Sequence, residues 1–168
     1  QSDVDAVLFC GDVYKSRDPS TTQQREFAKR IGRLAQHGIK VVLVVGNHDT
    51  PNAIGRATSV EIFDTLAVQN VHVASAPAVV QLITKHGPLQ IATLPWVTRS
   101  ALLTREDVKN KTLEQVNNQL AEAIGRIVES LVAQLNYDVP AVLAAHLSVA
   151  GAIPGSERSI MLGQDYVL

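Results

Sequence analysis

The sequence predicts an α/β fold built on a parallel sheet, and three observations support this prediction. Residues 41–45 (VVLVV) form a continuous, mostly β-branched run, which is typical of a strand buried on both faces of a parallel sheet. Residues 4–10 (VDAVLFC) form a second run of this kind. The segment between them has helical periodicity, so strand, helix and strand follow one another as a right-handed βαβ unit.

The first unit is expected to begin with a strand over residues 2–10 and to continue through a polar loop into a helix. The residues able to cap the N-terminus of this helix are Ser20, Thr21 and Thr22. Its apolar face is expected to carry Phe27, Ile31, Leu34 and Ala35. His37 and Gly38 suit its C-terminal turn, and the next strand is expected over residues 39–45.

The rest of the chain predicts a short helix, three short strands, a long helix and a last strand. We expect the short helix over 59–66, the strands over 71–74, 79–83 and 89–94, the long helix over about 112–136 and the last strand over 141–145. A turn over residues 86–88 would join the second and third strands. Residues 98–111 are expected to be a loop or a short helical piece, and residues 148–163 a loop.

Composition favours one globular domain over residues 1–168. The chain is 46% hydrophobic and 18% charged, and its net charge of −1 gives no global attraction to nucleic acid but allows a local basic patch. Its one cysteine, Cys10, excludes an intramolecular disulfide and fits a reducing, cytoplasmic compartment. We expect Cys10 to be a buried packing residue. No apolar run approaches the roughly 20 residues of a membrane span, so no membrane partner is expected.

Polar side chains follow three of the predicted strands, at the point where each strand ends. Asp12, Asn47 and His146 should therefore meet at the carboxyl edge of the sheet, where ligands bind in open α/β folds. A carboxylate, an amide oxygen and an imidazole suit Mn²⁺, Fe²⁺ or Zn²⁺. His48 lies next to Asn47 and could donate a proton to a leaving oxygen, with Asp49 orienting its imidazole.

Each of these residues also has an ordinary structural explanation when it is taken singly. An Asp after a strand is usually a turn residue, an Asn-His pair after Gly is an ordinary turn, and a lone His is more often a partly buried core residue. The combination is more specific, because one buried strand ends in Gly-Asn-His-Asp and a second ends in Gly-Asp. We therefore favour the metal site over the structural explanation.

Two of these segments resemble signature blocks of the calcineurin-like metallophosphoesterases: Gly11-Asp12, and the GNHD sequence of residues 46–49. Three longer segments are similar to the bacterial SbcD subfamily, which is related to the double-strand-break repair nuclease Mre. These segments are 6–20 (AVLFCGDVYKSRDPS), 91–97 (IATLPWV) and 144–164 (AAHLSVAGAIPGSERSIMLGQ). The resemblance covers nearly the whole chain.

The resemblance implies a layered fold in which helices flank a mostly parallel or mixed β-sandwich, of which this chain holds the central part. It implies two divalent metal ions, Mn²⁺ first and Fe²⁺ or Zn²⁺ as alternatives. Asp12 would bridge the two ions, Asn47 and His146 would bind the second ion, and His48 would be the catalytic histidine. The implied activity is that of a DNA exonuclease or endonuclease in repair and recombination.

The implied partners are DNA, an SbcC-like ABC-type ATPase and a second copy of the chain. We expect the short helix over residues 59–66 to contribute to this homodimer. The side chains expected to do so are Val60, Ile62, Phe63 and Leu66.

The chain also departs from the family pattern. The family's Asp-x-His block would precede Gln1 and its Gly-His-x-His block would follow Leu168, so the chain is expected to be incomplete at both ends and to have little nuclease activity by itself. Ala145 stands where the family usually has Gly, and Lys15 where it usually has Asp. Two alternatives stay open: a phosphoesterase acting on nucleotides or other small phosphates, and an inactive fragment lacking half of the metal ligands.

Overall fold

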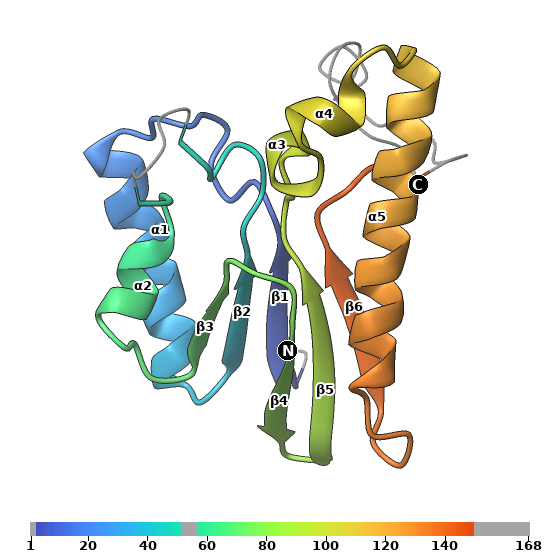
Figure 1. The fold of residues 1–168 in the computed structure, drawn as a ribbon. Coiled ribbons are helices and arrows are strands. Elements are labelled where there is room, and N and C mark those ends of the chain that lie inside the picture. Colours follow the sequence, from blue (N-terminus) through green and yellow to red (C-terminus); the bar gives the residue numbers. More distant parts are fainter. Residues whose placement is uncertain (1–2, 52–56, 150–168) are drawn as a thin grey trace. The chain divides into compact units, whose positions relative to one another are not determined.

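The computed structural model describes residues 3–51 and 57–149, which contain both helices and strands (Figure 1). The elements are β1 (Ala6–Cys10), α1 (Thr21–Gln36), β2 (Lys40–Val44), α2 (Glu61–Thr65), β3 (Val71–Ala74), β4 (Ala78–Thr84), β5 (Gly87–Leu94), α3 (Arg99–Leu102), α4 (Arg105–Val108), α5 (Leu113–Ala133) and β6 (Ala141–Ala145). Every helix and strand that the sequence predicted is present. The segment 98–111 holds the two short helices α3 and α4, and most of the loop expected over 148–163 lies outside the described residues.

Contacts divide the chain into two compact units. The first comprises Gln1–Trp96 and Gln134–His146, and the second comprises Val97–Ala133 and Leu147–Leu168. All six strands belong to the first unit, together with α1 and α2. The single domain over residues 1–168 stays a prediction.

The strands of the first unit form two three-stranded sheets. One sheet has the order β1-β2-β3 and is parallel throughout, with Cys10 paired to Val44 at the carboxyl end of β1. The other has the order β4-β5-β6, in which β4 and β5 form an antiparallel hairpin and β6 runs parallel to β5. The predicted βαβ unit is therefore confirmed. The hairpin pairs Thr84 with Gly87, so its turn consists of residues 85–86 and not of residues 86–88.

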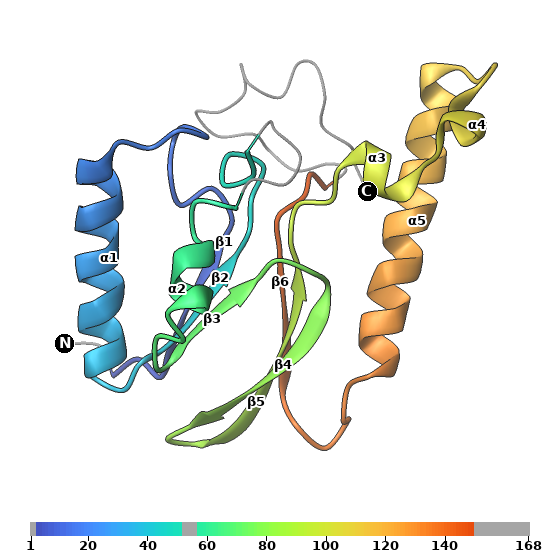
Figure 2. The same cartoon turned by 60° about the vertical axis from the view of Figure 1, so that its left-hand side comes forward.

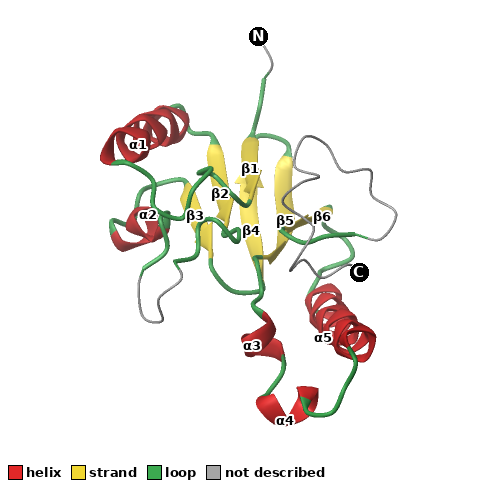
Figure 3. Ribbon diagram, turned by 90° about the horizontal axis from the view of Figure 1, so that it is seen from above, coloured by secondary structure: helices red, strands yellow, loops and turns green. Residues whose placement is uncertain are grey.

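Strand β2 separates two apolar clusters, because its alternate side chains point in opposite directions. Val41, Leu43 and Val45 pack with Ile31 of α1 and Phe63 of α2. On the opposite face, the side chains that pack together from both sheets are Val42, Val44, Ala74, Leu82, Ile91 and Ala144. The first unit thus has three layers, with α1 and α2 outside the β1-β2-β3 sheet and the second sheet facing it (Figures 2 and 3).

Helix α1 begins directly after the loop that carries Asp12. Ser20 is its N-cap: the Ser20 hydroxyl accepts the Gln23 N–H at 3.3 Å, and the Gln23 side chain accepts the Ser20 N–H at 2.8 Å. This capping box selects Ser20 among the three candidates. The helix ends at the C-cap His37, and Gly38 has a φ of +76°, as a C′ residue requires. Helix α1 is therefore capped at both of its ends.

The second unit consists of α3, α4, α5 and the residues that join them. The sequence predicts one apolar stripe along the long helix, at Leu113, Val116, Leu120, Ile124, Ile127, Leu131 and Leu135. Helix α5 buries a stripe with positions Val116, Leu120, Ala123, Ile124 and Leu131. Leu113, at the start of α5, is 77% exposed and lies outside this stripe. Within residues 3–51 and 57–149, no helix is both long and apolar enough to span a membrane.

Candidate metal centre

Asp12, Asn47 and His146 meet at one edge of the first unit. Asp12 and Asn47 follow β1 and β2, which end side by side in the same sheet. His146 follows β6 of the other sheet, where its backbone N–H donates to the Leu94 carbonyl at 2.9 Å. The structure therefore brings together the three residues that the sequence singled out, with two from one sheet and one from the other.

The imidazole of His146 lies between two oxygen atoms. Its Nδ1 is 2.9 Å from the carbonyl oxygen of Cys10, and its Nε2 is 2.8 Å from Oδ1 of Asn47. A carbonyl oxygen can only accept, so Nδ1 carries the proton and donates it to Cys10. In the neutral ring Nε2 then presents a lone pair towards Asn47, and Oδ1 of Asp12 lies 3.6 Å from the same nitrogen. Such a backbone hydrogen bond typically fixes the tautomer of a metal-binding histidine.

The donor set formed by these three side chains fits a divalent cation. A carboxylate oxygen, an amide oxygen and an imidazole nitrogen converge, and all three are electron-pair donors. The same side chains can also bond without a cation: after rotation of the Asn47 amide, its nitrogen donates to Oδ2 of Asp12 at 3.1 Å and to Nε2 of His146 at 2.8 Å. With the amide oxygen of Asn47 turned towards His146 and Asp12, the three side chains suit a cation. With the amide nitrogen turned towards them, its N–H groups occupy the position that the cation would take.

This donor set depends on an amide. Among residues 3–51 and 57–149 no three His, Cys, Asp or Glu side chains are grouped so as to hold a metal ion. Asn47 is the third donor beside Asp12 and His146, and the described residues thus supply ligands for one cation.

Two glycines allow the loops to approach one another closely. A Cβ atom on Gly11 would overlap the imidazole ring of His146, and a Cβ on Gly46 would overlap the backbone nitrogen and Oδ1 of Asp12. Gly11 also has a φ of +89°, which side chains rarely tolerate. The glycines that precede Asp12 and Asn47 are therefore required by the packing of the site.

Asp12 is held in a strained backbone conformation. Its φ of +49° lies in the left-handed region, which Asp tolerates better than most residues but which still costs free energy. Its Oδ1 accepts the backbone N–H of His48 at 2.8 Å, and its side chain stays about one-third exposed, at 32%. The carboxylate thus ties the two loops together and still faces the solvent.

His48 is oriented by a backbone carbonyl. Its Nδ1 lies 2.9 Å from the carbonyl oxygen of Lys15, so this nitrogen carries the proton that bonds Lys15. The ring is half-buried and its Nε2 is the atom left to exchange a proton. We expected Asp49 to orient this ring, but the structure gives that role to Lys15.

Asp49 instead binds backbone N–H groups of the loops that follow β1 and β2. It is 1% exposed; its Oδ2 accepts the Gly46 N–H at 2.9 Å, and Ser59 donates to its Oδ1 at 3.4 Å. Burial raises the pKa of Asp49 and the nearby Asp12 charge raises it further, whereas the backbone N–H groups of Gly46, Asp12 and Tyr14 act in the opposite direction. The buried carboxylate therefore joins both glycine-containing loops at their base.

Two further residues lie at this edge that were not among the predicted site residues. Arg17 donates from Nε to the carbonyl oxygen of Asn47 at 2.9 Å, across 30 residues of sequence. Trp96 packs edge-on against His146, with ring centroids 6.0 Å apart, and its backbone N–H donates to the Val45 carbonyl at 2.8 Å. The signal for Trp96 was its place just after β5, at the same carboxyl edge as the other strand ends. The signal for Arg17 was its place in the polar loop between β1 and α1, five residues after Asp12.

Two expectations about packing are wrong. Cys10 is exposed, because it lies at the end of β1, where the strand leaves the core, and its carbonyl is the group that contributes to the site. Val60 and Phe63 are buried within the first unit, at 1% and 6% exposure, and so cannot form a dimer contact. Of the four side chains expected to contribute to a dimer, Ile62 and Leu66 are exposed, at 53% and 67%.

Comparison with known proteins agrees with this geometry. Residues 1–150 match the calcineurin-like phosphoesterase family. The chain belongs to the calcineurin-like phosphoesterases. A relative within this family is the SbcD component of the nuclease SbcCD from Rhodobacter capsulatus, which is 28% identical over 182 aligned positions. The alignment covers 98% of the present chain but 44% of the relative, so this phosphoesterase chain spans less than half the length of the curated relative it matches.

Proposed function

We propose that this chain is part of a metal-dependent phosphodiesterase that cleaves DNA as an exonuclease or endonuclease of the SbcD type. The observation that carries the proposal is the convergence of Asp12, Asn47 and His146 on one point, with His48 beside it. Family membership supports phosphoester hydrolysis, and the resemblance to a nuclease component supports DNA as the substrate. The proposed setting is DNA repair and recombination.

In this proposal Asp12, Asn47 and His146 hold a divalent cation, with Mn²⁺ as the first candidate and Fe²⁺ or Zn²⁺ as alternatives. The bound cation supplies Lewis acidity at a phosphoryl oxygen and neutralises developing charge. The Cys10 carbonyl keeps His146 in the tautomer that offers Nε2 to the cation. A second cation, bridged by Asp12, belongs to the proposal through the family resemblance.

His48 is the proposed general acid. The Lys15 carbonyl fixes Nδ1 and leaves Nε2 to carry the proton that passes to the leaving oxygen. The backbone of His48 is bonded to Asp12, so the ring is placed beside the carboxylate that would hold the cation. An exchangeable proton next to an electrophilic centre is the arrangement that phosphodiester cleavage needs.

The proposed partners follow from the relative. Its name makes it one component of a nuclease called SbcCD, and an SbcC-like ABC-type ATPase is accordingly the proposed partner here. A homodimer is proposed as well. Because Val60 and Phe63 are buried, the contribution of α2 to such a dimer would have to come from Ile62 and Leu66.

The test separates metal binding from chemistry. Mn²⁺ binding is measured by calorimetry, and cleavage is measured on bis(p-nitrophenyl) phosphate and on an end-labelled duplex oligonucleotide, using this chain and the longest native form of the protein. We expect Asp12→Asn and His146→Gln to lose both properties, and His48→Asn to keep Mn²⁺ binding but lose cleavage. His86→Gln, in the turn between β4 and β5, is the matched control and should behave as wild type.

Four outcomes would contradict the proposal. Cleavage that survives removal of divalent metal, or that is unchanged in His48→Asn, would exclude the proposed chemistry. Hydrolysis of the small diester without any cleavage of DNA by the longest form would favour the small-phosphate alternative. Failure of the chain to bind Mn²⁺ would favour the inactive fragment.

A further inference from the structure

We propose that the outward face of α1 is a second contact surface for duplex DNA, which binds the phosphate backbone away from the metal centre. The inference rests on the proposed function, because that proposal makes DNA the polyanion that the protein meets. The inference goes beyond the proposed function because it assigns DNA binding to a surface that has no part in the chemistry.

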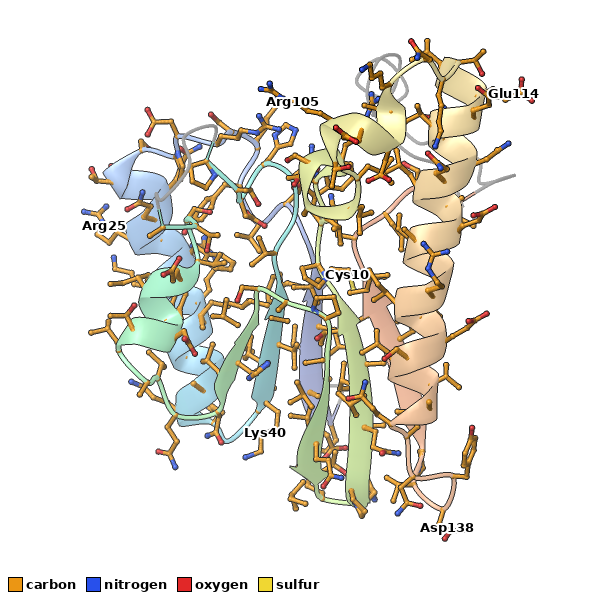
Figure 4. All side chains as sticks on the ribbon, in the orientation of Figure 1. Cys10, Arg25, Lys40, Arg105, Glu114 and Asp138 are labelled. Carbon is orange, nitrogen blue, oxygen red and sulfur yellow. The ribbon has the colours of Figure 1, made fainter. Side chains whose placement is uncertain are left out.

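The first argument is the distribution of charge. Residues 25–40 carry five Lys or Arg side chains and one carboxylate, whereas the whole chain has a net charge of −1. At 3.6 residues per turn, the charged positions of α1 fall on one side of the helix. These positions are Arg25, Glu26, Lys29, Arg30 and Arg33, with His37 at the C-cap continuing the row. Ile31 and Leu34 fall on the other side and pack into the core. Arg25, the first cation of the row, points away from the strands (Figure 4).

The second argument is that the positive charge on this face is not neutralised. Glu26 is shared by Arg25 at 3.2 Å, Lys29 at 3.1 Å and Arg30 at 3.6 Å, so one carboxylate serves three cations. The side chains of these three cations remain 61–68% exposed. Arg33 makes no ion pair with any residue in the described part of the chain. An exposed row of this kind attracts anions from solution.

The third argument concerns the shape of the surface. Arg30, Arg33, Leu34, His37 and Ile39 line a hollow of about 180 Å³ near the end of α1. Sites for small organic ligands usually enclose about 300–1,000 Å³, so this hollow is too small and too open for such a ligand. The lining of the hollow is almost wholly apolar, so we assign the contact with phosphate groups to the exposed cations of α1 and not to the hollow.

The fourth argument favours nucleic acid over an acidic protein. Protein interfaces are centred on buried aromatic and aliphatic side chains, whereas DNA interfaces are polar and strongly positive. None of the exposed large hydrophobic side chains of the described residues lies on α1. The row from Arg25 to His37 covers about 18 Å at 1.5 Å per residue, which is about five base-pair steps of 3.4 Å. Several phosphates of one strand can therefore contact it together.

The test measures DNA binding without cleavage. A fluorescent duplex is titrated with the protein in EDTA at several salt concentrations, and the dissociation constant is read from anisotropy. We expect Lys29→Gln, Arg30→Gln and Arg33→Gln combined to weaken binding by about tenfold or more, and to reduce the slope of log K against log salt by about 2 to 3. Glu26→Gln removes the one carboxylate of this face and should tighten binding, an effect that misfolding cannot imitate.

The matched control removes three cations from the second unit, by combining Arg105→Gln, Lys109→Gln and Lys111→Gln. It lowers the net charge by the same amount, so an equal loss in both triple variants would overturn a specific role for α1. An unchanged salt slope in the α1 variant would do the same. If the protein binds poly-glutamate through the α1 cations and has no affinity for DNA, the inference is overturned in favour of an acidic protein partner.

Failure of this inference can be told apart from failure of the proposed function. If the α1 variant binds and cleaves DNA as wild type does, the inference is wrong and the nuclease proposal stands. If the wild type binds no duplex at low salt, the inference is wrong. Mn²⁺-dependent hydrolysis of bis(p-nitrophenyl) phosphate then shows whether the phosphodiesterase chemistry survives.

Discussion

The glycine before Asp12 has a steric role that only its close neighbours reveal. Gly11→Ala would force a methyl group into the His146 ring and place Ala at a φ of +89°. The backbone conformation alone should cost about 1–2 kcal/mol, and the overlap should displace His146 from Asn47. We expect a lower free energy of unfolding in urea and weaker Mn²⁺ binding by calorimetry.

Gly32→Ala is the matched control for this prediction. Gly32 lies inside α1, and a Cβ there would meet no atom within 4 Å. Since Ala favours a helix over Gly by about 1 kcal/mol, this variant should be more stable than wild type and bind Mn²⁺ equally well. Equal Mn²⁺ affinity in Gly11→Ala and wild type would show that His146 does not need this close contact.

Tyr14 should make the protein sensitive to alkali. Burial raises the pKa of Tyr14, and the Asp49 carboxylate raises it further. The folded state therefore holds this proton more tightly than the unfolded chain, whose tyrosines titrate at about 10. The stability that results is complete below the unfolded pKa and is lost as the pH rises through the folded pKa. When the pH is raised, the phenolate absorbance should show one late step, which is an ionisation at a higher pH than that of an ordinary tyrosine.

Two substitutions assign that step. Tyr14→Phe should remove the late step and flatten the alkaline decline of the urea midpoint. Tyr137→Phe, at a site that is 85% exposed, should leave both the late step and the alkaline decline unchanged. A late step that persists in Tyr14→Phe would contradict the assignment to this buried phenol.

At the level of single residues, sequence patterns located the site but not its supporting contacts. Asp12, Asn47 and His146 were predictable because each follows a strand, and strand ends in a layered α/β fold meet at one edge. The partner of His48 was not, since the Lys15 carbonyl is a backbone group and no side-chain pattern marks it. The exposure of Cys10 was missed because hydrophobic runs do not show where a strand leaves the core.

Helix α1 is stabilised by its N-cap residue, Ser20. Ser20→Ala removes the hydroxyl that accepts the Gln23 N–H, and should cost about 1 kcal/mol of stability in urea denaturation. Thr22→Ala is the control, because Thr22 lies within the first turn and does not cap. It should be neutral or slightly stabilising, since Ala has the higher helix propensity. If both variants lose the same stability, the cap assignment is wrong.

The type of each element was predictable because its apolar residues formed either an uninterrupted run or a pattern with a helical period. β2 was recognised from a run without polar interruptions, and the structure shows why: its two faces bury different clusters. α5 was recognised from steps of three and four residues. Ends were less predictable. The β4–β5 turn was placed over residues 86–88 because Gly and Pro favour turns, yet cross-strand pairing draws Gly87 and Pro88 into β5.

At the scale of the whole molecule, the proposed cation adds a link between two sheets that also meet through apolar side chains and through hydrogen bonds, such as that from the Trp96 N–H to the Val45 carbonyl. Asp12 and Asn47 belong to loops of the β1-β2-β3 sheet, and His146 ends a strand of the β4-β5-β6 sheet. Occupation of the site should therefore stabilise the packing of one sheet on the other. It should also favour the inward orientation of the Asn47 amide oxygen.

This linkage gives a prediction that needs no knowledge of the substrate. A ligand that binds the folded state alone stabilises it by about 2.7 kcal/mol when its free concentration is 100 times the dissociation constant. Mn²⁺ should raise the urea midpoint accordingly, and EDTA should reverse the change. His146→Gln and Asp12→Asn should abolish the shift, whereas His37→Gln should keep it. A shift that persists in both site variants would place the bound metal elsewhere, and the two sheets would then be held together without it.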